Sequence, residues 1–172
     1  GLVWSYSKKE RRIASYDEAR FQIGAAAYHL TTPNLYNGIE QDELFMRYAF
    51  YGKGFFGLSQ SNMALVPNLL VQLQGPNVEV IAGTYFRIRI KEASKVTGFV
   101  KESAFSLGAN YRYGDAFSPG VLFELSNYAI GLSYDLNISK LTPATNMRGG
   151  FEVTLRFLNP SPFLYKNYKP SL

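Results

Sequence analysis

Hydrophobic and polar residues alternate with a period of two along most of the chain. Between residues 128 and 136, Tyr, Ile, Leu, Tyr and Leu stand at every second position, and Ala, Gly, Ser and Asp lie between them. Because successive side chains of a β-strand point to opposite faces, this pattern predicts a strand with one apolar face. The same alternation predicts strands over residues 20–29, 46–58, 63–73, 78–90, 105–113, 117–125 and 150–157, about eight in all. No segment has a convincing helical period.

Turn sequences separate several of these strands. They are Ser59-Gln60-Ser61-Asn62, Gln74-Gly75-Pro76-Asn77, Gly114-Asp115 and Ser126-Asn127. Such short connections join antiparallel neighbours, so the sequence predicts an antiparallel meander. Longer connections cover residues 30–43, 91–102 and 137–148.

The polar faces of the predicted strands distinguish two all-β architectures. A soluble sandwich would place many Lys, Glu and Thr residues on its outward face. Here the polar faces carry small residues such as Gly83, Gly108 and Gly131, with isolated Arg and Glu, which suits a barrel lumen. Tyr and Phe cluster near strand ends, where the interfacial girdles of membrane barrels lie. The pattern favours an antiparallel up-and-down transmembrane β-barrel, with a soluble β-barrel binding protein or a sandwich as the alternative.

Composition narrows the classes further. The 172 residues include 18 Lys+Arg and 13 Asp+Glu, and aromatic residues make up 16%, which argues against disorder. The basic residues are spread along the chain, so we expect no nucleic-acid partner. The absence of Cys excludes a disulfide scaffold, a thiolate nucleophile and Cys-ligated zinc. No apolar run is long enough for a transmembrane helix, but barrel strands need only about 9–11 residues each.

The first residues look like the end of a strand that begins earlier. Leu2, Trp4 and Tyr6 alternate with Val3, Ser5 and Ser7. Eight strands can close alone, but this additional strand end predicts a larger barrel with an even number of strands. We therefore expect residues 1–159 to be the C-terminal portion of one outer-membrane barrel and residues 160–172 to be a tail.

The segment from residue 130 to residue 153 resembles a known C-terminal signature. It reads IGLSYDLNIS at 130–139, LTPA at 141–144 and RGGFEV at 148–153. These motifs are similar to those of the PorP/SprF family, outer-membrane proteins of the type IX secretion system in Bacteroidota. Weaker similarities at Tyr28-His29-Leu30, Pro33-Asn34, Arg47-Tyr48, Val66-Pro67 and Gln74-Gly75-Pro76 extend the resemblance over about 21–158.

The resemblance implies a function and a set of partners. Such barrels help to export or anchor large surface proteins and take part in gliding motility. The sequence itself contains no catalytic constellation, so we expect no enzymatic activity, cofactor or metal. The implied partners are outer-membrane lipid, type IX components in the periplasm and outer membrane, and secreted surface-protein cargo. If the C-terminus is periplasmic, strand counting places residues 30–43, 74–77, 114–115 and 137–148 outside the cell.

Eight charged residues fall on predicted lumen faces and form the first candidate site. They are Glu79, Arg87, Arg89, Arg112, Glu124, Asp135, Glu152 and Arg156. We favour internal ion pairing, because unpaired charge in a confined interior is costly. The alternative is a selectivity lining of a general solute porin.

The connection from Asn137 to Gly150 forms the second candidate site, a contact loop. Its candidate residues are Asn137, Leu141, Pro143, Asn146 and Arg148. Either it touches cargo or plugs the lumen, or it is an ordinary ordered loop. Asn137-Ile138-Ser139 matches a glycosylation sequon, which we interpret as turn chemistry.

Catalytic patterns are weak. His29 is the sole His, so no His-paired metal site is available, and we interpret it as a structural residue. Residues 52–57 match G-x-G-x-x-G, but the match lies within a strand pattern with no following helix. A barrel hydrolase using rim acids is a minor hypothesis without a paired base; its candidates are Glu40, Asp42, Glu43 and Asp115.

Overall fold

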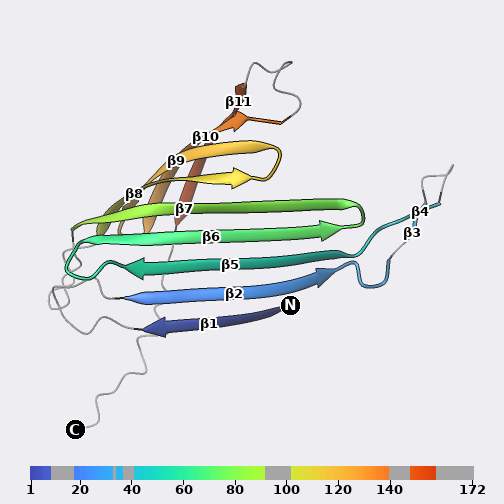
Figure 1. Ribbon diagram of the computed structural model, residues 1–172, viewed down its shortest axis with the longest axis horizontal. Helices are drawn as coiled ribbons and strands as arrows, with labels where there is room; N and C mark the ends of the chain where they lie inside the picture. The colour runs from blue at the N-terminus through green and yellow to red at the C-terminus, as the bar shows by residue number, and fades with distance from the viewer. Residues whose placement is uncertain (9–17, 33, 37–40, 92–101, 140–147, 158–172) are drawn as a thin grey trace, which may run out of the picture.

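The computed structural model describes residues 1–8, 18–32, 34–36, 41–91, 102–139 and 148–157. These residues form one nine-stranded antiparallel sheet and one two-stranded sheet (Figure 1). The large sheet contains β1 (Leu2–Lys8), β2 (Ala19–Tyr28), β5 (Arg47–Gly57), β6 (Met63–Gln74), β7 (Asn77–Lys91), β8 (Ser103–Arg112), β9 (Ala116–Leu125), β10 (Tyr128–Asn137) and β11 (Arg148–Phe157). None of the described residues forms a helix that is long and apolar enough to cross a membrane.

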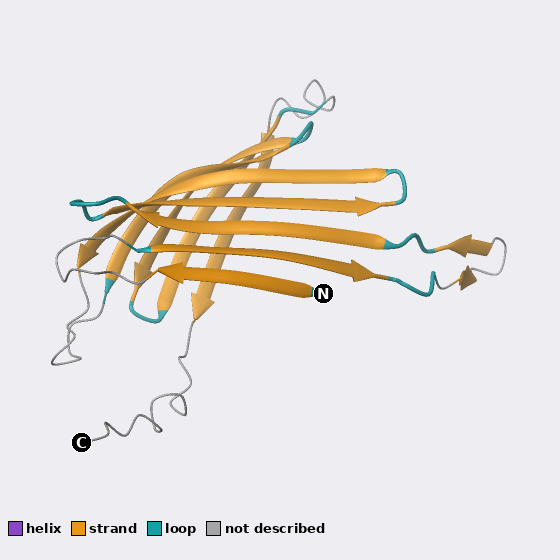
Figure 2. Ribbon diagram, turned by 60° about the horizontal axis from the view of Figure 1, so that its bottom comes forward, coloured by secondary structure: helices purple, strands orange, loops and turns teal. Residues whose placement is uncertain are grey.

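The strands of the large sheet follow one another in chain order, from β1 at one edge to β11 at the other. Every neighbouring pair is antiparallel, which confirms the predicted up-and-down meander. The sheet curls strongly, so that β8–β11 pass behind β5–β7 (Figures 1 and 2). Within the described residues β1 and β11 do not pair, and the sheet is therefore open. The larger barrel, of which the sequence predicts these strands to be a part, stays a prediction.

One pair of strands lies where the sequence predicts only a connection. β3 (Asn34–Tyr36) and β4 (Gln41–Glu43) pair antiparallel between β2 and β5. Strands of three residues are too short to show a period of two. The sequence does contain Asn37-Gly38 between them, which is a strong local signal for a hairpin.

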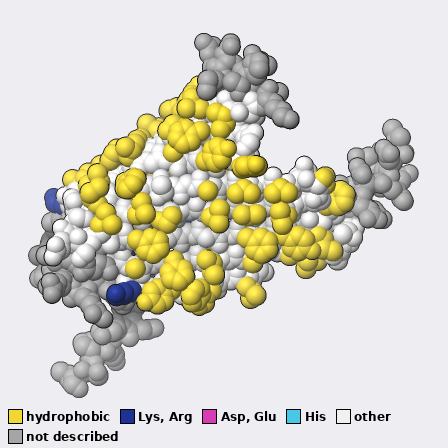
Figure 3. All heavy atoms as spheres, viewed as in Figure 1, with side chains coloured by type: hydrophobic (Ala, Val, Ile, Leu, Met, Phe, Trp, Pro, Cys, Tyr) yellow, Lys and Arg dark blue, Asp and Glu magenta, His cyan; other side chains and the backbone are white. Residues whose placement is uncertain are grey.

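The sheet has two chemically different faces, which we call the outer face and the inner face. The paired residues Leu65, Phe86, Leu107 and Val121 form one row across the outer face. The adjacent row on the inner face is Val66, Tyr85, Gly108, Gly120 and Ser133. Hydrophobic side chains cover the convex surface in Figure 3, and Lys or Arg is seen only near one end of the strands. The alternation read from the sequence therefore assigns the faces correctly.

Burial in this sheet is the reverse of that in a water-soluble domain. Among the described residues, the nearly inaccessible ones are small and lie on the inner face: Ala64, Ala104, Ser106, Ala116, Gly120, Ala129 and Gly131. Large apolar residues of the outer face are exposed, with Phe86 at 51% and Leu155 at 73%. Soluble proteins instead bury Leu, Ile, Val and Phe. In the described part of the chain, no other element covers the large apolar side chains of the outer face.

Glycines let side chains lie flat against the inner face. A Cβ atom on Gly108 would collide with Tyr85 and with the backbone of Thr84, because the Tyr85 ring lies against this glycine. Tyr51 covers Gly24 in the same way across the β2–β5 pair. A bulky neighbour that covers a glycine shields its backbone from solvent, and the missing side chain permits strong curvature.

Candidate functional site on the inner face

The strands bring seven of the eight predicted lumen charges to the inner face. Their cross-strand partners are inner-face residues, as in the pairs of Arg87 with Ser106 and of Arg156 with Ala129. Asp135 lies at an irregularity of the β10–β11 ladder between Tyr134 and Leu136. That these residues line a lumen remains a prediction.

Four charged side chains form a connected network near the end of the sheet where β7 ends and β8 begins. Arg87 Nε donates to Glu124 Oε2 at 2.5 Å, and Arg87 Nη2 donates to Glu102 Oε1 at 2.8 Å. Arg156 Nη2 donates to the other oxygen of Glu124, Oε1, at 2.7 Å. Glu124 on β9 thus joins β7 to β11. These side chains are therefore paired with one another, and their position inside a lumen stays a prediction.

An aromatic ring extends this network toward β2. The guanidinium carbon of Arg87 lies 5.9 Å from the centroid of the Phe55 ring, and that of Arg20 lies 4.7 Å from it. Both distances fit cation–π contacts. Arg20 also contacts Glu18 at 2.9 Å. We call Phe55, Arg87, Glu102, Glu124 and Arg156 the inner belt.

Small residues fill the spaces between members of the inner belt. Ala64 of β6, Ser106 of β8 and Ala129 of β10 are at most 3% exposed. Each belongs to a strand between two strands that contribute a long belt side chain. Arg87 therefore reaches across β8 to Glu124, and it is itself only 14% exposed. Such partly buried charges are tolerated because they are paired and hydrogen-bonded.

A second ion-pair cluster lies at the opposite end of the strands. Arg112 Nη1 donates to Asp115 Oδ2 at 3.0 Å, and Arg112 Nε lies 3.5 Å from Glu79 Oε1. The longer contact lacks hydrogen-bond geometry, because Arg112 Nε has no hydrogen-bond partner. These side chains are 40% to 48% exposed, so the pairs contribute little to stability.

The remaining candidate residues have other surroundings. The Arg89 backbone N–H donates to the Asn62 carbonyl at 2.8 Å, and the Arg89 carbonyl accepts a hydrogen bond from the side-chain Nδ2 of Asn62 at 2.9 Å. No ion pair links Glu152 to another residue in the described part of the chain. No group of three or more His, Asp or Glu residues could hold a metal among the described residues.

The candidate contact loop is described only at its two ends. Asn137 Oδ1 accepts hydrogen bonds from Ser139 N at 3.0 Å and from Ser139 Oγ at 2.6 Å. This local turn fits the interpretation of Asn137-Ile138-Ser139 as turn chemistry. Arg148 begins β11, and its backbone pairs with Leu136. Leu141, Pro143 and Asn146 lie outside the described residues.

Two members of the inner belt escape sequence analysis. Glu102 falls in the predicted 91–102 connection, where no strand period assigns it to a face. Phe55 lies on the inner face of β5 next to the outer-face residue Phe56, so aromatic character alone does not distinguish them. The adjacent pair Phe55-Phe56 could have revealed an inner-face ring, because two adjacent strand residues must point to opposite faces.

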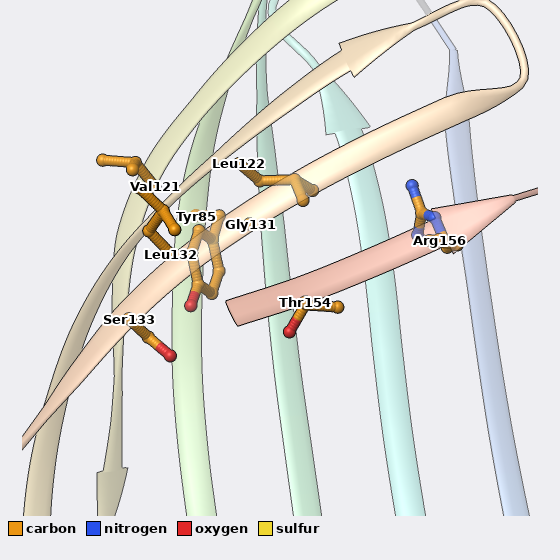
Figure 4. Close-up of a pocket in the computed structure, with 8 residues that line it drawn as sticks. All are labelled: Tyr85, Val121, Leu122, Gly131, Leu132, Ser133, Thr154 and Arg156. Carbon is orange, nitrogen blue, oxygen red and sulfur yellow. The ribbon is translucent and has the colours of Figure 1, made fainter. Parts of the chain in front are cut away.

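A hollow of about 230 Å³ adjoins the inner belt (Figure 4). Its lining includes Tyr85, Gly131, Ser133, Thr154 and Arg156. In the close-up, Tyr85, Ser133 and Thr154 project from the same side of the sheet, and Val121 points away from them. Asn110 Nδ2 donates to Tyr85 Oη at 3.2 Å. Thr154 and Arg156 of the edge strand β11 form one wall of the hollow. The shape of the hollow therefore depends on any strand that pairs with β11.

Comparison with protein families identifies the family. A family model described as "Type IX secretion system membrane protein PorP/SprF" matches residues 14–157. The chain belongs to this family. The match covers every strand from β2 to β11, which agrees with the resemblance expected over about 21–158. No curated protein and no solved structure matches the chain. This PorP/SprF chain is therefore a membrane component of a type IX secretion system.

Proposed function

We propose that this PorP/SprF chain forms part of an outer-membrane β-barrel that supports export or surface anchoring of large secreted proteins. The observation that carries the proposal is the inverted distribution of side chains on its sheet. Apolar residues cover the outer face, while the inner face carries the paired charges and the small residues. Family membership supplies the secretion system in which such a barrel acts.

The outer face is suited to lipid on energetic grounds. Complete burial of one Val, Leu, Ile or Phe side chain contributes about 1.5–3 kcal/mol, and 23 such residues are exposed in the described part of the chain. An exposed patch of this extent would make a monomer aggregate in water. The strands β5 to β11 contain 10 to 15 residues, and a barrel strand needs about 9–11 to cross the hydrocarbon region.

Closure of the barrel follows from strand direction. Nine strands alternate in direction, so β1 and β11 run the same way. Their direct pairing would create a parallel pair in a sheet whose other pairs are all antiparallel. An odd number of additional strands avoids this and gives an even total, as in bacterial outer-membrane barrels.

The two ends of the strands offer different surfaces for partners. One end carries the turns at residues 75–76 and 113–115 and the connection from β10 to β11. We place this end outside the cell, where the contact loop would meet cargo. The other end carries the inner belt and would face periplasmic components of the secretion system. A role in gliding motility is part of the same proposal.

A general solute porin is the second candidate. Its selectivity would require charges that are presented to solutes. In the inner belt Glu124 is shared between Arg87 and Arg156, and Arg87 also contacts Glu102. Such mutual pairing favours bracing of the wall over selection of ions. For the hydrolase hypothesis, Asp115 pairs with Arg112, and we propose no catalytic role.

Affinity purification of the intact protein from detergent-solubilised outer membranes tests the proposed function. Mass spectrometry should identify type IX components or a large surface protein among the co-purified proteins. In a matched strain that lacks the protein, that surface protein should be retained inside the cell or released into the medium. Purification of the barrel alone, combined with faster uptake of small solutes into cells that contain it, would favour the porin. Recovery from the soluble fraction would overturn the membrane assignment.

A further inference from the structure

The last residue of the inner belt is Arg156, on the edge strand β11. Arg156 contacts one carboxylate, that of Glu124, and its side chain is 47% exposed. Arg87, in the middle of the belt, contacts two carboxylates and is 14% exposed. The two guanidinium groups share Glu124, yet among the described residues only Arg87 has a second acidic partner.

Long and small side chains alternate from strand to strand along the belt. Phe55, Arg87, Glu124 and Arg156 belong to β5, β7, β9 and β11. The strands between them contribute the small buried residues Ala64, Ala104, Ser106 and Ala129. Two of the three ion pairs of the belt therefore join strands two positions apart, from Arg87 to Glu124 and from Glu124 to Arg156, while Glu102, the third carboxylate, directly precedes β8.

We infer that the strands which cover β11 continue this alternation. The strand that pairs with β11 has a small inner-face residue opposite Arg156, and the strand after it carries an aspartate or glutamate that pairs with Arg156. The inference rests on the barrel proposed above. Closure of the barrel requires only that further strands be present. The inference adds which types of residue those strands place on the inner face beside Arg156.

Desolvation supplies the physical reason for a second carboxylate. Pairing of the β11 edge removes Arg156 from much of its solvent, and a guanidinium with five N–H donors then needs acceptors from protein. A buried charge that lacks a partner is strongly destabilising. A large residue opposite Arg156 would block the approach of its side chain to the strand beyond. Arg87 can reach Glu124 because its own cross-strand partner is the small residue Ser106.

The occupant is an antiparallel strand of the same polypeptide. Its outward residues must be apolar, because they continue the exposed outer-face residues Phe151, Val153, Leu155 and Phe157, which are 56% to 73% exposed. Backbone pairing with the free edge of β11 supplies the register. A second copy of the protein is the competing occupant, and the experiment below distinguishes the two.

Site-directed cross-linking of the intact protein in outer membranes tests this inference. The chain contains no Cys, so Thr154→Cys carries a photoreactive label on the inner face beside Arg156. Leu155→Cys carries the same label on the outer face as the control. We expect Thr154→Cys to join a strand of the same polypeptide with a small residue in the Arg156 row, followed by a strand with an inward Asp or Glu. A product with a second copy, a strand that lacks these residues, or no product overturns the inference.

A double-mutant cycle provides an independent readout. Arg156→Gln and replacement of the identified carboxylate by its amide should each lower the folded, heat-modifiable fraction, and the double variant should lose less than the sum of the two single losses. Arg156→Lys, which keeps the charge, is the control for loss of packing. Additive losses overturn the inference. Co-purification of secretion components with the wild-type protein tests the proposed function separately, so the two failures are distinguishable.

Discussion

Replacement of Glu124 by Gln should destabilise the sheet by removing the negative charge that two guanidinium groups share. The Glu124 side chain is 20% exposed, and it accepts hydrogen bonds from Arg87 at 2.5 Å and from Arg156 at 2.7 Å. A hydrogen bond to a charged group contributes about 1.5–3 kcal/mol, while exposed ion pairs contribute about 0–1 kcal/mol. Arg87 is shielded but keeps Glu102, and Arg156 is half exposed, so we expect a loss of about 2 kcal/mol in the free energy of unfolding.

Urea unfolding of the intact protein in lipid vesicles measures this loss. Heat-modifiable gel migration reports the folded fraction, and with an m value of about 2 kcal/mol/M the midpoint should fall by about 1 M. Glu152→Gln is the matched control, because it removes the same charge from the same inner face, where Glu152 pairs across strands with Ser133. It should change stability by less than about 0.5 kcal/mol. Equal midpoints for Glu124→Gln and wild type, or an equal loss in both variants, would refute the reasoning.

Two further substitutions test the two faces of the sheet. Leu107→Arg places a charge on the outer face and should cost about 2–4 kcal/mol if this position lies at the bilayer midplane; the urea midpoint in vesicles checks this, and a neutral result would contradict contact with lipid. Gly108→Val introduces side-chain atoms where Tyr85 and the backbone of Thr84 lie, so we expect a loss of folded protein on heat-modifiable gels. The double variant with Tyr85→Ala should recover only part of that loss, because the backbone collision remains, and full recovery would show that the ring alone forbids a side chain there.

The period of two in the sequence predicts much of this fold, because burial on one side of a sheet constrains every second residue. It places Phe86 and Leu107 on the outer face and Arg87 and Gly108 on the inner face. The turn sequences also predict the order of the strands. Those two features also place the charges on one face of the sheet, where Glu124 and Arg156 share a row through Ala129 and Arg87 lies in the next row.

Contacts between side chains from distant strands do not follow from the period. Arg87 and Glu124 are 37 residues apart and occupy strands that are not neighbours, so their meeting depends on the register of two ladders and on the small residue Ser106 between them. The period of two also does not predict where the pairing register between two strands shifts. The register shifts between Arg89 and Lys91, so that Lys91 pairs with Ser103. A bulge of this kind changes the face to which the following side chains point.

The most direct test of the central claim compares lipid contact along β7 residue by residue. Single Cys substitutions at Thr84, Tyr85, Phe86 and Arg87 would each carry an environment-sensitive fluorophore, in the intact protein reconstituted with brominated lipids. We predict quenching at Thr84 and Phe86, whose partners belong to the outer face, and little quenching at Tyr85 and Arg87. Equal quenching at all four positions, or quenching confined to Tyr85 and Arg87, would contradict the assignment of the outer face to lipid and the inner face to the lumen.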